Sequence, residues 1–315
     1  MQLIHGDCLE VMRGMRTGSV NCCVTSPPYF GLRDYGVDGQ IGLEPTPDEF
    51  VAALVEVFRE VRRVLRDDGT LWLNLGDSYA SNPASGGSKS SGLNAKRDAD
   101  GGLAADNKSQ GITPASKYRR PPGLKPKDLI GIPWRVAFAL QADGWYLRQD
   151  IIWHKPNPMP ESVRDRCTKA HEYIFLLSKS VRYYYDADAV KEPSVDPDRV
   201  RGDAIGHTQR KLADRPVDRK ADQCFTRNRR SVWTVTTKPF KGAHFATFPP
   251  KLIEPCILAG CPVGGVVLDP FSGAGTSGLV ALQHGREYIG IELNEEYLKM
   301  SEARIKHAQE QTKCQ

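Results

Sequence analysis

Two short segments of this 315-residue chain combine residue types that could bind a ligand and act on it. The first is the turn Ser26-Pro27-Pro28-Tyr29, which follows the apolar run Asn21–Thr25. The two prolines keep the backbone extended and remove two N–H donors, so carbonyl acceptors, the Ser26 hydroxyl and the Tyr29 ring remain. Such a turn suits a planar base that carries an exocyclic amine. The alternative is a proline-terminated strand with a surface tyrosine.

The second segment is a glycine-rich turn near the carboxyl end of the chain. The apolar run Val266–Leu268 leads through Asp269-Pro270-Phe271-Ser272 into Gly273-Ala274-Gly275-Thr276. Glycines let a ligand approach the backbone closely, and the N-terminus of the helix expected next favours electronegative groups. Glu292 follows Gly273 by about 20 residues, at the end of the next expected strand, where a carboxylate can accept hydrogen bonds from ribose hydroxyls.

The same turn matches a dinucleotide-binding pattern, because Gly273, Gly275 and Gly278 spell GxGxxG. In a dinucleotide site the first glycine comes directly after the strand, whereas residues 269–272 intervene here. A purely structural turn is the other alternative. The spacing favours a nucleoside ligand without a pyrophosphate, and S-adenosylmethionine fits that description.

Alternating strands and helices surround the two turns. Apolar runs predict strands at 21–25, 70–75, 147–153, 173–177, 266–268 and 288–291, and helical spacing predicts helices at 48–66, 249–259, 276–284 and 294–309. Asp48 is the expected N-cap of the first helix, and Gly69 lies beyond its end. This alternation predicts an α/β fold, with a mostly parallel sheet covered by helices on both faces.

The composition limits the class of protein. Hydrophobic residues make up 40% of the chain, which is enough to build a core. No apolar run approaches the roughly 18–20 residues of a membrane span, and the N-terminus lacks the pattern of a signal peptide. The eight cysteines include no CxxC pair, which argues against a zinc site and a disulfide framework. We therefore expect a reduced, soluble, cytoplasmic protein with no metal site.

The net charge of +5 conceals an uneven distribution of charge. Residues 179–243 hold 15 Lys and Arg against 9 Asp and Glu, and residues 80–125 hold 8 against 3. Residues 80–125 contain almost no large apolar residue, so we expect a mobile loop there. Basic side chains interleaved with Tyr183-Tyr184-Tyr185 and Trp233 suit contacts with phosphates and bases. Within this set Arg227, Arg229 and Arg230 are the best cluster to test as base readers.

The two turns and their order resemble those of DNA amino-methyltransferases of the permuted beta class. In that class an (S/D)PP(Y/F) motif lies N-terminal and an FxGxG motif lies near the C-terminus, as Ser26–Tyr29 and Phe271–Gly275 do here. Segments 152–160 and 171–175 are also similar to family segments, and the resemblance extends over 126–179 and 244–304. It implies a Rossmann-like class I S-adenosylmethionine-dependent methyltransferase fold with circularly permuted motif order.

The resemblance also implies a reaction, which is methyl transfer from S-adenosylmethionine to the exocyclic amine of a base extruded from duplex DNA. In that reaction the Ser26 hydroxyl and the Pro27 carbonyl would accept the two N–H hydrogens of the amine. This would direct the nitrogen lone pair at the methyl group. Tyr29 would stack on the base, and Pro28 would complete the catalytic turn.

Further residues match the cofactor-binding positions of the family. Phe271 would lie against the adenine, Gly273 and Gly275 would admit the methionine and ribose portions, and Glu292 would hold the ribose. Asp269 is a candidate for the methionine ammonium group, and Asp7 matches a position near the adenine amine. Phe245 belongs to a segment that closes over the methionine, although ordinary packing would also explain its ring. The remaining expected members of the site are Pro270, Ser272 and Thr276.

By the same resemblance the chain has five parts. The catalytic domain takes residues 1–79 and 126–179, a basic loop insertion takes 80–125, a target-recognition region takes 180–243, and the cofactor-binding part takes 244–315. Double-stranded DNA is the expected partner and a membrane is not. A homodimer and a cognate restriction endonuclease also fit the resemblance, and the sequence does not decide whether either exists.

Several alternatives concern the chemistry. Serine at the first motif position favours cytosine N4, and adenine N6 stays open. Cytosine C5 chemistry would need a nucleophilic cysteine. Cys256, in the only Pro-Cys pair, is instead predicted to be a core residue of its helix. A nucleotide-linked oxidoreductase and a catalytically inactive DNA-binding protein are the remaining alternatives.

Overall fold

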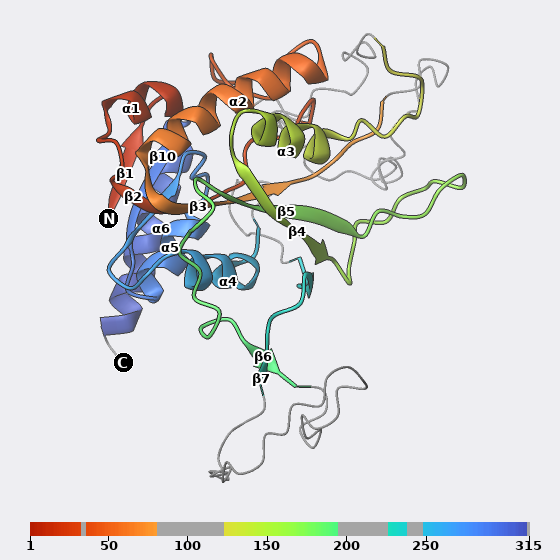
Figure 1. Cartoon of the computed structure of the whole chain (residues 1–315). Coiled ribbons are helices and arrows are strands. Elements are labelled where there is room, and N and C mark those ends of the chain that lie inside the picture. Colours follow the sequence, from red (N-terminus) through yellow and green to blue (C-terminus); the bar gives the residue numbers. More distant parts are fainter. Residues whose placement is uncertain (33–35, 81–122, 195–225, 238–247, 314–315) are drawn as a thin grey trace, which may run out of the picture.

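The computed structural model describes residues 1–32, 36–80, 123–194, 226–237 and 248–313 of the chain. Its centre is an eight-stranded sheet with the strand order β1-β10-β9-β2-β3-β5-β4-β8 (Figure 1). The strands are β1 (Gln2–His5), β2 (Val20–Thr25), β3 (Leu65–Leu75), β4 (Tyr146–His154), β5 (His171–Ser178), β8 (Val232–Thr234), β9 (Val266–Asp269) and β10 (Glu287–Glu292). A separate pair is formed by β6 (Glu192–Pro193) and β7 (Thr226–Arg227). The predicted α/β architecture with a mostly parallel sheet is confirmed.

The direction of the strands decides which residues meet. Strands β1, β10, β9, β2 and β3 pair in parallel, and β8 pairs in parallel with β4. Strand β5 runs antiparallel to both of its neighbours, β3 and β4. The carboxyl ends of the parallel strands therefore share one edge of the sheet with the amino end of β5, where Tyr173 is opposite Leu75 and His171 is opposite His154.

Helices cover both faces of the sheet (Figure 1). One face carries α1 (Cys8–Gly14), α2 (Pro47–Val64) and α3 (Ile132–Ala142), and the other carries α4 (Pro250–Gly260), α5 (Thr276–Gln283) and α6 (Glu295–Lys313). A hydrophobic core lies on each face of the sheet. Side chains of β3 alternate between the two cores, since Leu71 and Leu73 pack in the core beneath α1, α2 and α3, and Trp72 packs in the core beneath α4, α5 and α6. In the described part of the chain, no helix combines the length and apolar character of a membrane span.

The N-cap predicted for the first long helix is wrong. Thr46, two residues before Asp48, caps α2, because its hydroxyl accepts a hydrogen bond from the Glu49 N–H at 3.2 Å and the Glu49 carboxylate accepts one from the Thr46 N–H at 3.1 Å. This reciprocal capping box is a recognised helix start, and Pro47 suits the first helical position. Asp48 instead lies in the first turn, where its charge favours the helix dipole.

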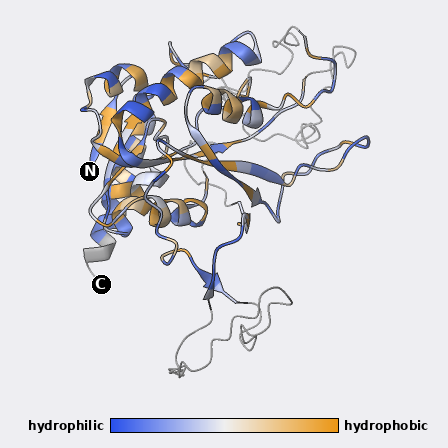
Figure 2. Cartoon of the chain, in the orientation of Figure 1, coloured by the Kyte–Doolittle hydropathy of each residue, from blue (hydrophilic) through white to orange (hydrophobic). Residues whose placement is uncertain are grey.

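The region predicted to recognise DNA contributes a strand to the main sheet. Trp233 lies in β8 and is only 6% exposed, because it packs in the core shared with α4. Trp233, which the sequence placed among the aromatic residues suited to DNA contact, is therefore a core residue of the sheet. Apolar residues gather in the sheet and helices, whereas the β6–β7 pair is largely hydrophilic (Figure 2). Nearly all of the predicted basic insertion at 80–125 lies outside the described residues.

Candidate functional site

A cavity of about 140 Å³ opens at the sheet edge where the parallel strands end. Its wall includes the predicted residues Asp7, Ser26, Pro27, Pro28, Tyr29, Asp269, Pro270, Phe271, Ser272, Gly273, Thr276 and Glu292. Apolar side chains complete the wall, among them Leu32, Ile41, Phe248 and Tyr297. The two turns are far apart in the sequence, and the parallel strands β2 and β9 bring them together because they are neighbours in the sheet. Phe245 lies outside the described residues, and Gly275 does not line the cavity.

Glu292 ends β10 and is held by the backbone around it. Its Oε2 accepts a hydrogen bond from the Gly273 N–H at 2.7 Å, and its Oε1 accepts one from the Asn294 N–H at 2.9 Å. A carboxylate oxygen has two lone pairs, so each oxygen retains capacity for a ligand hydroxyl. Burial raises the pKa of the Glu292 carboxyl, and the hydrogen bonds from Asn294 and Gly273 act in the opposite direction. These features fit the ribose-binding role, which stays a prediction.

Asp7 follows β1, the strand next to β10, and lines the same cavity as Glu292. Its Oδ1 accepts hydrogen bonds from the Leu9 and Glu10 N–H groups at 2.9 and 3.0 Å, so Asp7 caps α1. The preceding residue, Gly6, donates its N–H to the Glu292 carbonyl oxygen at 3.0 Å. Asp7 and Glu292 are thereby fixed to one another through β1 and β10. Two carboxylates at fixed positions can each accept a donor group of one polar ligand.

Asp269 is 1% exposed, and its carboxylate is engaged inside the protein. Its Oδ1 accepts hydrogen bonds from the Thr25 hydroxyl at 2.6 Å and the Phe271 N–H at 3.1 Å, and its Oδ2 accepts one from the Ser277 hydroxyl at 2.6 Å. Burial raises the pKa of Asp269 to about 6, although all three hydrogen bonds act in the opposite direction. The side chain thus joins β2, β9 and α5, and its contact with an ammonium group stays a prediction.

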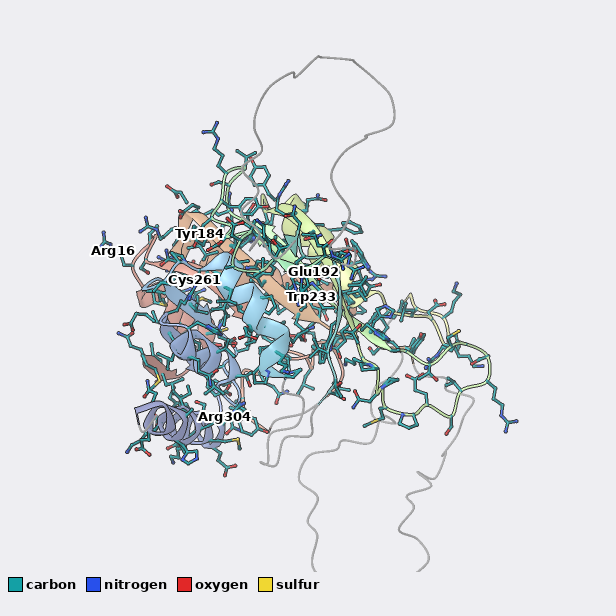
Figure 3. The ribbon with its side chains drawn as sticks, turned by 90° about the horizontal axis from the view of Figure 1, so that it is seen from below. Arg16, Tyr184, Glu192, Trp233, Cys261 and Arg304 are labelled. Atoms are coloured by element: carbon teal, nitrogen blue, oxygen red, sulfur yellow. The ribbon has the colours of Figure 1, made fainter. Side chains whose placement is uncertain are left out.

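Two hydroxyl groups of the glycine turn also bond within the protein. The Ser272 hydroxyl hydrogen bonds with the Tyr288 hydroxyl at 2.9 Å, and the Thr276 hydroxyl accepts a hydrogen bond from Arg304 at 2.8 Å. Arg304 is a residue of α6 (Figure 3) and also donates to the Ala274 carbonyl at 2.9 Å. Ser272 and Thr276 are 5% and 4% exposed, so their main effect is to hold the turn in shape.

The glycines of the turn divide between two tasks. Gly273 has a φ of 51° and lines the cavity, where its N–H reaches Glu292. Gly275 has a φ of 70°, and a Cβ atom there would lie 2.8 Å from the Cβ of Ser301 on α6. A Cβ on Gly278 would lie 2.5 Å from the ring of Tyr288. Gly275 and Gly278 are therefore needed for close packing between elements, whereas the resemblance implied that Gly275 admits the ligand.

The first turn leaves β2 and enters the same cavity. Pro27 is buried, whereas Ser26, Pro28 and Tyr29 are half-buried. The Tyr29 ring lies against the backbone of Gly76, which follows β3, since a Cβ atom on Gly76 would be 2.4 Å from the ring Cε2 atom. A flat side chain thus occupies a place that is open only because residue 76 is glycine.

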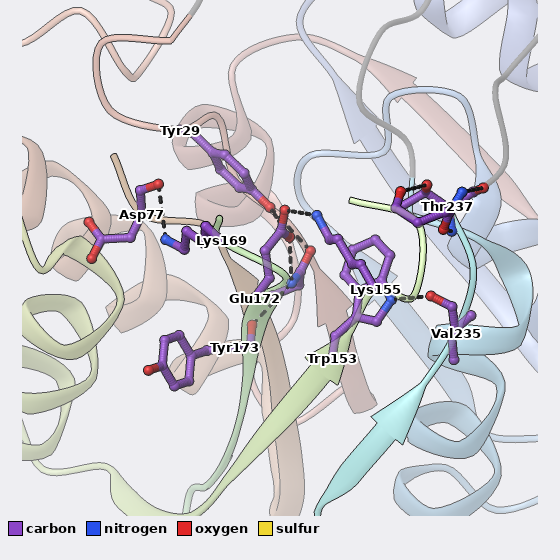
Figure 4. Close-up of polar contacts among 11 residues, drawn as sticks. Tyr29, Asp77, Trp153, Lys155, Lys169, Glu172, Tyr173, Val235 and Thr237 are labelled. Atoms are coloured by element: carbon purple, nitrogen blue, oxygen red, sulfur yellow. Dashed lines mark hydrogen bonds and ion pairs between the residues drawn. The ribbon is translucent and has the colours of Figure 1, made fainter. Parts of the chain in front are cut away.

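A polar network beside this turn was not predicted from the sequence. The Tyr29 hydroxyl donates to the Glu172 carboxylate at 2.8 Å, and Glu172 also accepts from Asn74 and Lys155 (Figure 4). Lys155 and Glu172 lie in the segments 152–160 and 171–175 that are similar to family segments, but their residue types alone gave them no role. Polar residues on separate strands carry no sequence signal that they will touch.

The basic residues proposed as base readers contact their own chain. Arg227 and Arg230 both donate to the Glu192 Oε1, at 2.9 and 2.8 Å, and the Arg229 guanidinium lies over the Trp233 ring at 4.7 Å from its centre. Glu192 and Trp233 lie on the same side of the molecule (Figure 3). Contact of these arginines with DNA stays a prediction.

The cysteines agree with the prediction of a core role. Cys22, Cys23 and Cys256 are fully buried free thiols, and burial raises the pKa of each. The pKa of Cys256 is raised far beyond the range in which a thiolate forms readily, which opposes nucleophilic chemistry at that residue. The prediction that Cys256 is a core residue is confirmed.

Comparison with known proteins gives a consistent result over nearly the whole chain. A family model described as DNA methylase (N6_N4_Mtase) matches residues 20–303. The Type II methyltransferase M.Cfr9I of Citrobacter freundii is 51% identical over 303 residues, which cover 96% of this chain and 87% of that protein. The Type II methyltransferase M.SmaI of Serratia marcescens is 49% identical, with coverage of 96% and 90%.

Solved structures match the fold at lower sequence identity. The PvuII DNA methyltransferase (cytosine-N4-specific) has a TM-score of 0.61 and 20% identity, and the match covers 97% of this chain and 90% of that one. A putative DNA modification methylase of Thermus thermophilus, solved in complex with S-adenosyl-L-methionine, has a TM-score of 0.59 and 23% identity, with coverage of 98% and 93%. At this level of identity the similarity is one of fold.

Proposed function

The chain belongs to the DNA methylase family of N6/N4 amino-methyltransferases, and we propose that it methylates the exocyclic N4 amine of a cytosine extruded from duplex DNA. The observation that carries the proposal is the convergence of Ser26-Pro27-Pro28-Tyr29 and the Phe271–Thr276 turn on one cavity. Serine, rather than aspartate, at the first position of the catalytic turn favours cytosine N4 over adenine N6.

The methyl donor is S-adenosyl-L-methionine, whose sulfonium supplies an electrophilic methyl group. The cavity offers residues that suit it. Glu292 has acceptor capacity for ribose hydroxyls, Phe271 offers a ring for the adenine, and Asp7 is placed near enough to Glu292 to bind the other end of the nucleoside. Gly273 lets the ligand approach the backbone. These four residues are the binding set that we propose.

The catalytic turn makes a poor nucleophile reactive. The lone pair of an exocyclic amine is delocalised into the base, and acceptors on both N–H hydrogens favour a tetrahedral nitrogen. The Ser26 hydroxyl and the Pro27 carbonyl are the acceptors in this proposal, and they also stabilise positive charge that develops on the nitrogen. Tyr29 stacks on the extruded base, an interaction typically worth ~1–3 kcal/mol. No covalent enzyme intermediate is needed: the nitrogen–carbon bond forms as the sulfur–carbon bond breaks, the neutral thioether S-adenosylhomocysteine leaves, and the methylated nitrogen releases one proton to solvent.

One experiment tests the methylated atom. Unmethylated plasmid DNA is incubated with the protein and a labelled methyl donor, and its nucleosides are then separated by mass spectrometry. We expect labelled N4-methylcytosine. N6-methyladenine would overturn the choice of amine, and the absence of any label in DNA would overturn the proposed function. Ser26→Ala is the matched variant: we expect it to bind the donor, measured by calorimetry, and to lose transfer about 100- to 1000-fold.

The same proposal includes partners and location. Similarity to Type II methyltransferases supports a cognate restriction endonuclease and a cytoplasmic location, where genomic DNA is the substrate. DNA methylated by this protein should resist a restriction endonuclease that has the same recognition sequence. Digestion with a panel of restriction endonucleases will identify that sequence. A homodimer is the expected assembly, and sedimentation velocity of the full chain tests it.

A further inference from the structure

Glu172 is the acceptor at the centre of the network beside the catalytic turn (Figure 4). Its Oε2 accepts hydrogen bonds from the Tyr29 hydroxyl at 2.8 Å and the Asn74 Nδ2 at 3.3 Å, and its Oε1 forms an ion pair with the Lys155 ammonium. The Tyr29 hydroxyl has two acceptors within reach, the Glu172 Oε2 at 2.8 Å and the Asn74 Oδ1 at 3.3 Å, and the shorter distance and the charge of the carboxylate favour Glu172. The tip of the Tyr29 ring is thereby tied to β5.

The charge of Glu172 is balanced where it lies. The Glu172 and Lys155 side chains are 15% and 18% exposed, so each would be costly to leave unpaired. The Lys155 ammonium also lies over the ring of Trp153, 4.3 Å from its centre, which favours a cation at that point. Lys155 therefore balances the charge of the Glu172 carboxylate, which accepts the hydrogen bond from Tyr29 at a partly buried position.

The sheet topology explains why these residues meet. Tyr29 follows β2, Asn74 lies near the carboxyl end of β3, and Lys155 follows β4. Glu172 comes from the amino end of β5, which reaches the same edge only because β5 is antiparallel to its neighbours. Asn74 strengthens the junction, since its Nδ2 also donates to the Tyr173 carbonyl at 3.0 Å. The network thus connects the catalytic turn to two strands of the rigid sheet.

Contacts at its edge and at its hydroxyl define the position of the Tyr29 ring. Gly76 bounds one edge of the ring, and Glu172 holds the hydroxyl. A ring held at its edge and at its tip has little freedom to tilt. We propose that Glu172 is a positioning residue for methyl transfer, which acts through the Tyr29 hydroxyl to hold the ring where the extruded base stacks. This inference rests on the proposed function, because it assigns Tyr29 the stacking role.

The test is a double-mutant cycle between Glu172→Gln and Tyr29→Phe. Tyr29→Phe keeps the stacking ring and removes only the tether, and Glu172→Gln keeps the size of the side chain and removes its charge. Single-turnover methyl transfer to unmethylated plasmid DNA is measured with labelled S-adenosylmethionine. We expect each single variant to slow transfer about 10- to 100-fold and to leave the KM for the methyl donor within about threefold.

The double variant gives the readout that a merely structural role would not move. If Glu172 acts through the hydroxyl, adding Glu172→Gln to Tyr29→Phe changes the rate by less than about twofold. Multiplied effects of the two changes, or a Glu172→Gln rate equal to that of the unaltered protein, would overturn the inference. A Tyr29→Phe variant with an unaltered rate would do the same.

A matched control separates this network from ion pairs in general. Glu60 pairs with Arg63 on α2, is 22% exposed and lies outside the cavity wall. Glu60→Gln should leave the transfer rate within about twofold of the unaltered protein. Failure of the unaltered protein to label DNA would refute the proposed function, whereas labelling without the expected loss in the variants would refute only the role of Glu172.

Discussion

Gly76 has a role beside the proposed catalytic turn that its residue type alone does not reveal. It follows β3, its φ is not positive, and yet an added Cβ atom would lie 2.4 Å from the Tyr29 ring. The requirement for glycine is therefore the space for this ring and not the backbone conformation. A single methyl group at position 76 must displace either the ring or the strand end.

We expect Gly76→Ala to slow methyl transfer about 100-fold, because a shift of about 1 Å in a positioning group can cost that much. Cofactor affinity should change little, since Gly76 does not line the cavity. Single-turnover transfer and calorimetric titration with the methyl donor measure the two effects. Circular dichroism controls for folding. An unaltered transfer rate in a folded variant would contradict the assigned ring position.

Asp269 links the active-site edge to the pH dependence of stability. Its pKa is raised to about 6 by burial, from an ordinary value of 3.8, so the folded protein binds a proton more readily than the unfolded chain. The stability that Asp269 contributes is then fully present below pH ~4 and is lost as the pH rises through about 6. Ionisation of Asp269 therefore lowers the free energy of unfolding by about 3 kcal/mol between pH ~4 and pH 8.

Asp269→Asn should remove this cost. The amide oxygen can still accept from Thr25 and Phe271, and the amide N–H group can donate to the Ser277 hydroxyl, whose hydrogen can then turn from residue 269 to the Val24 carbonyl at 3.2 Å. We expect the variant to be about 1–3 kcal/mol more stable at pH 8 and little changed at pH 4. Urea unfolding at both pH values measures this. A loss of stability at pH 8 would show that the ionised carboxylate is favourable in place.

The same variant tests the predicted ammonium contact of Asp269. Loss of a charged partner would weaken binding of the methyl donor at least about tenfold, whereas a residue that only joins β2, β9 and α5 would leave its affinity nearly unchanged. Because the two oxygens of Asp269 already accept three hydrogen bonds, we expect the smaller effect. Calorimetry at pH 8 distinguishes the outcomes.

Among the elements, helix α2 begins with a capping box formed by Thr46 and Glu49. This capping box marks the first residue of the helix, which the spacing of apolar residues alone does not locate. Thr46→Ala removes the hydroxyl that accepts from the Glu49 N–H, and we expect a loss of about 1 kcal/mol in the free energy of unfolding. Asp48→Ala should cost less, since Asp48 contributes charge to the first turn and an exposed ion pair with Arg135 at 3.3 Å, and exposed ion pairs add little stability. Chemical denaturation of the two variants compares them, and a larger cost for Asp48→Ala would contradict the assignment.

Elements with a strong apolar pattern were predicted well, whereas α1, α3, β1 and β8 were not predicted. The helix predicted at 249–259 is α4 (Pro250–Gly260), and the strand predicted at 266–268 is β9 (Val266–Asp269). β1 and β8 have four and three residues, and unlike β9 neither contains three consecutive apolar residues. Their pairing with β10 and β4 makes them strands. Such edge strands depend on partners that are distant in the sequence, so local patterns do not predict them.

Over the molecule as a whole, charge is distributed between a slightly acidic body and two basic segments. Residues 80–125 and 179–243 carry 23 of the 43 Lys and Arg residues but only 12 of the 38 Asp and Glu residues. We expect a DNA substrate to be attracted to those segments, where each phosphate contact would release counterions. Binding should weaken steeply with salt even though the net charge is only +5.

We expect the logarithm of the DNA-binding constant to fall linearly with the logarithm of salt concentration. Lys96→Gln with Arg97→Gln should make the slope less steep by about 0.9 for each phosphate that is no longer neutralised. Arg59→Gln with Arg66→Gln is the matched control, because Arg66 is in the amino-terminal part of β3, away from the cavity edge. Fluorescence anisotropy of a labelled duplex measures the slopes. Equal changes in both pairs would contradict a role for the basic segment.

Consecutive residues were enough to outline the chemistry of this protein. A Ser-Pro-Pro-Tyr turn after an apolar strand, and a glycine turn followed by a carboxylate, are local patterns whose meaning depends on neighbours in the chain. The structure places Ser26, Phe271 and Glu292 at one cavity, as their motifs implied. Such patterns can be recognised without the fold, because backbone conformation and side-chain chemistry within a turn are set by the residues of that turn.

The residues that support this chemistry became apparent only in three dimensions. Glu172 meets Tyr29 because β5 is antiparallel, Gly76 is needed because the Tyr29 ring crosses its backbone, and Trp233 is buried because β8 joins β4. Each of these contacts joins residues from different strands, and the order and direction of those strands are set by packing of the whole sheet. The proposed catalytic turn was therefore visible in the sequence, whereas the network that holds it became visible only in the fold.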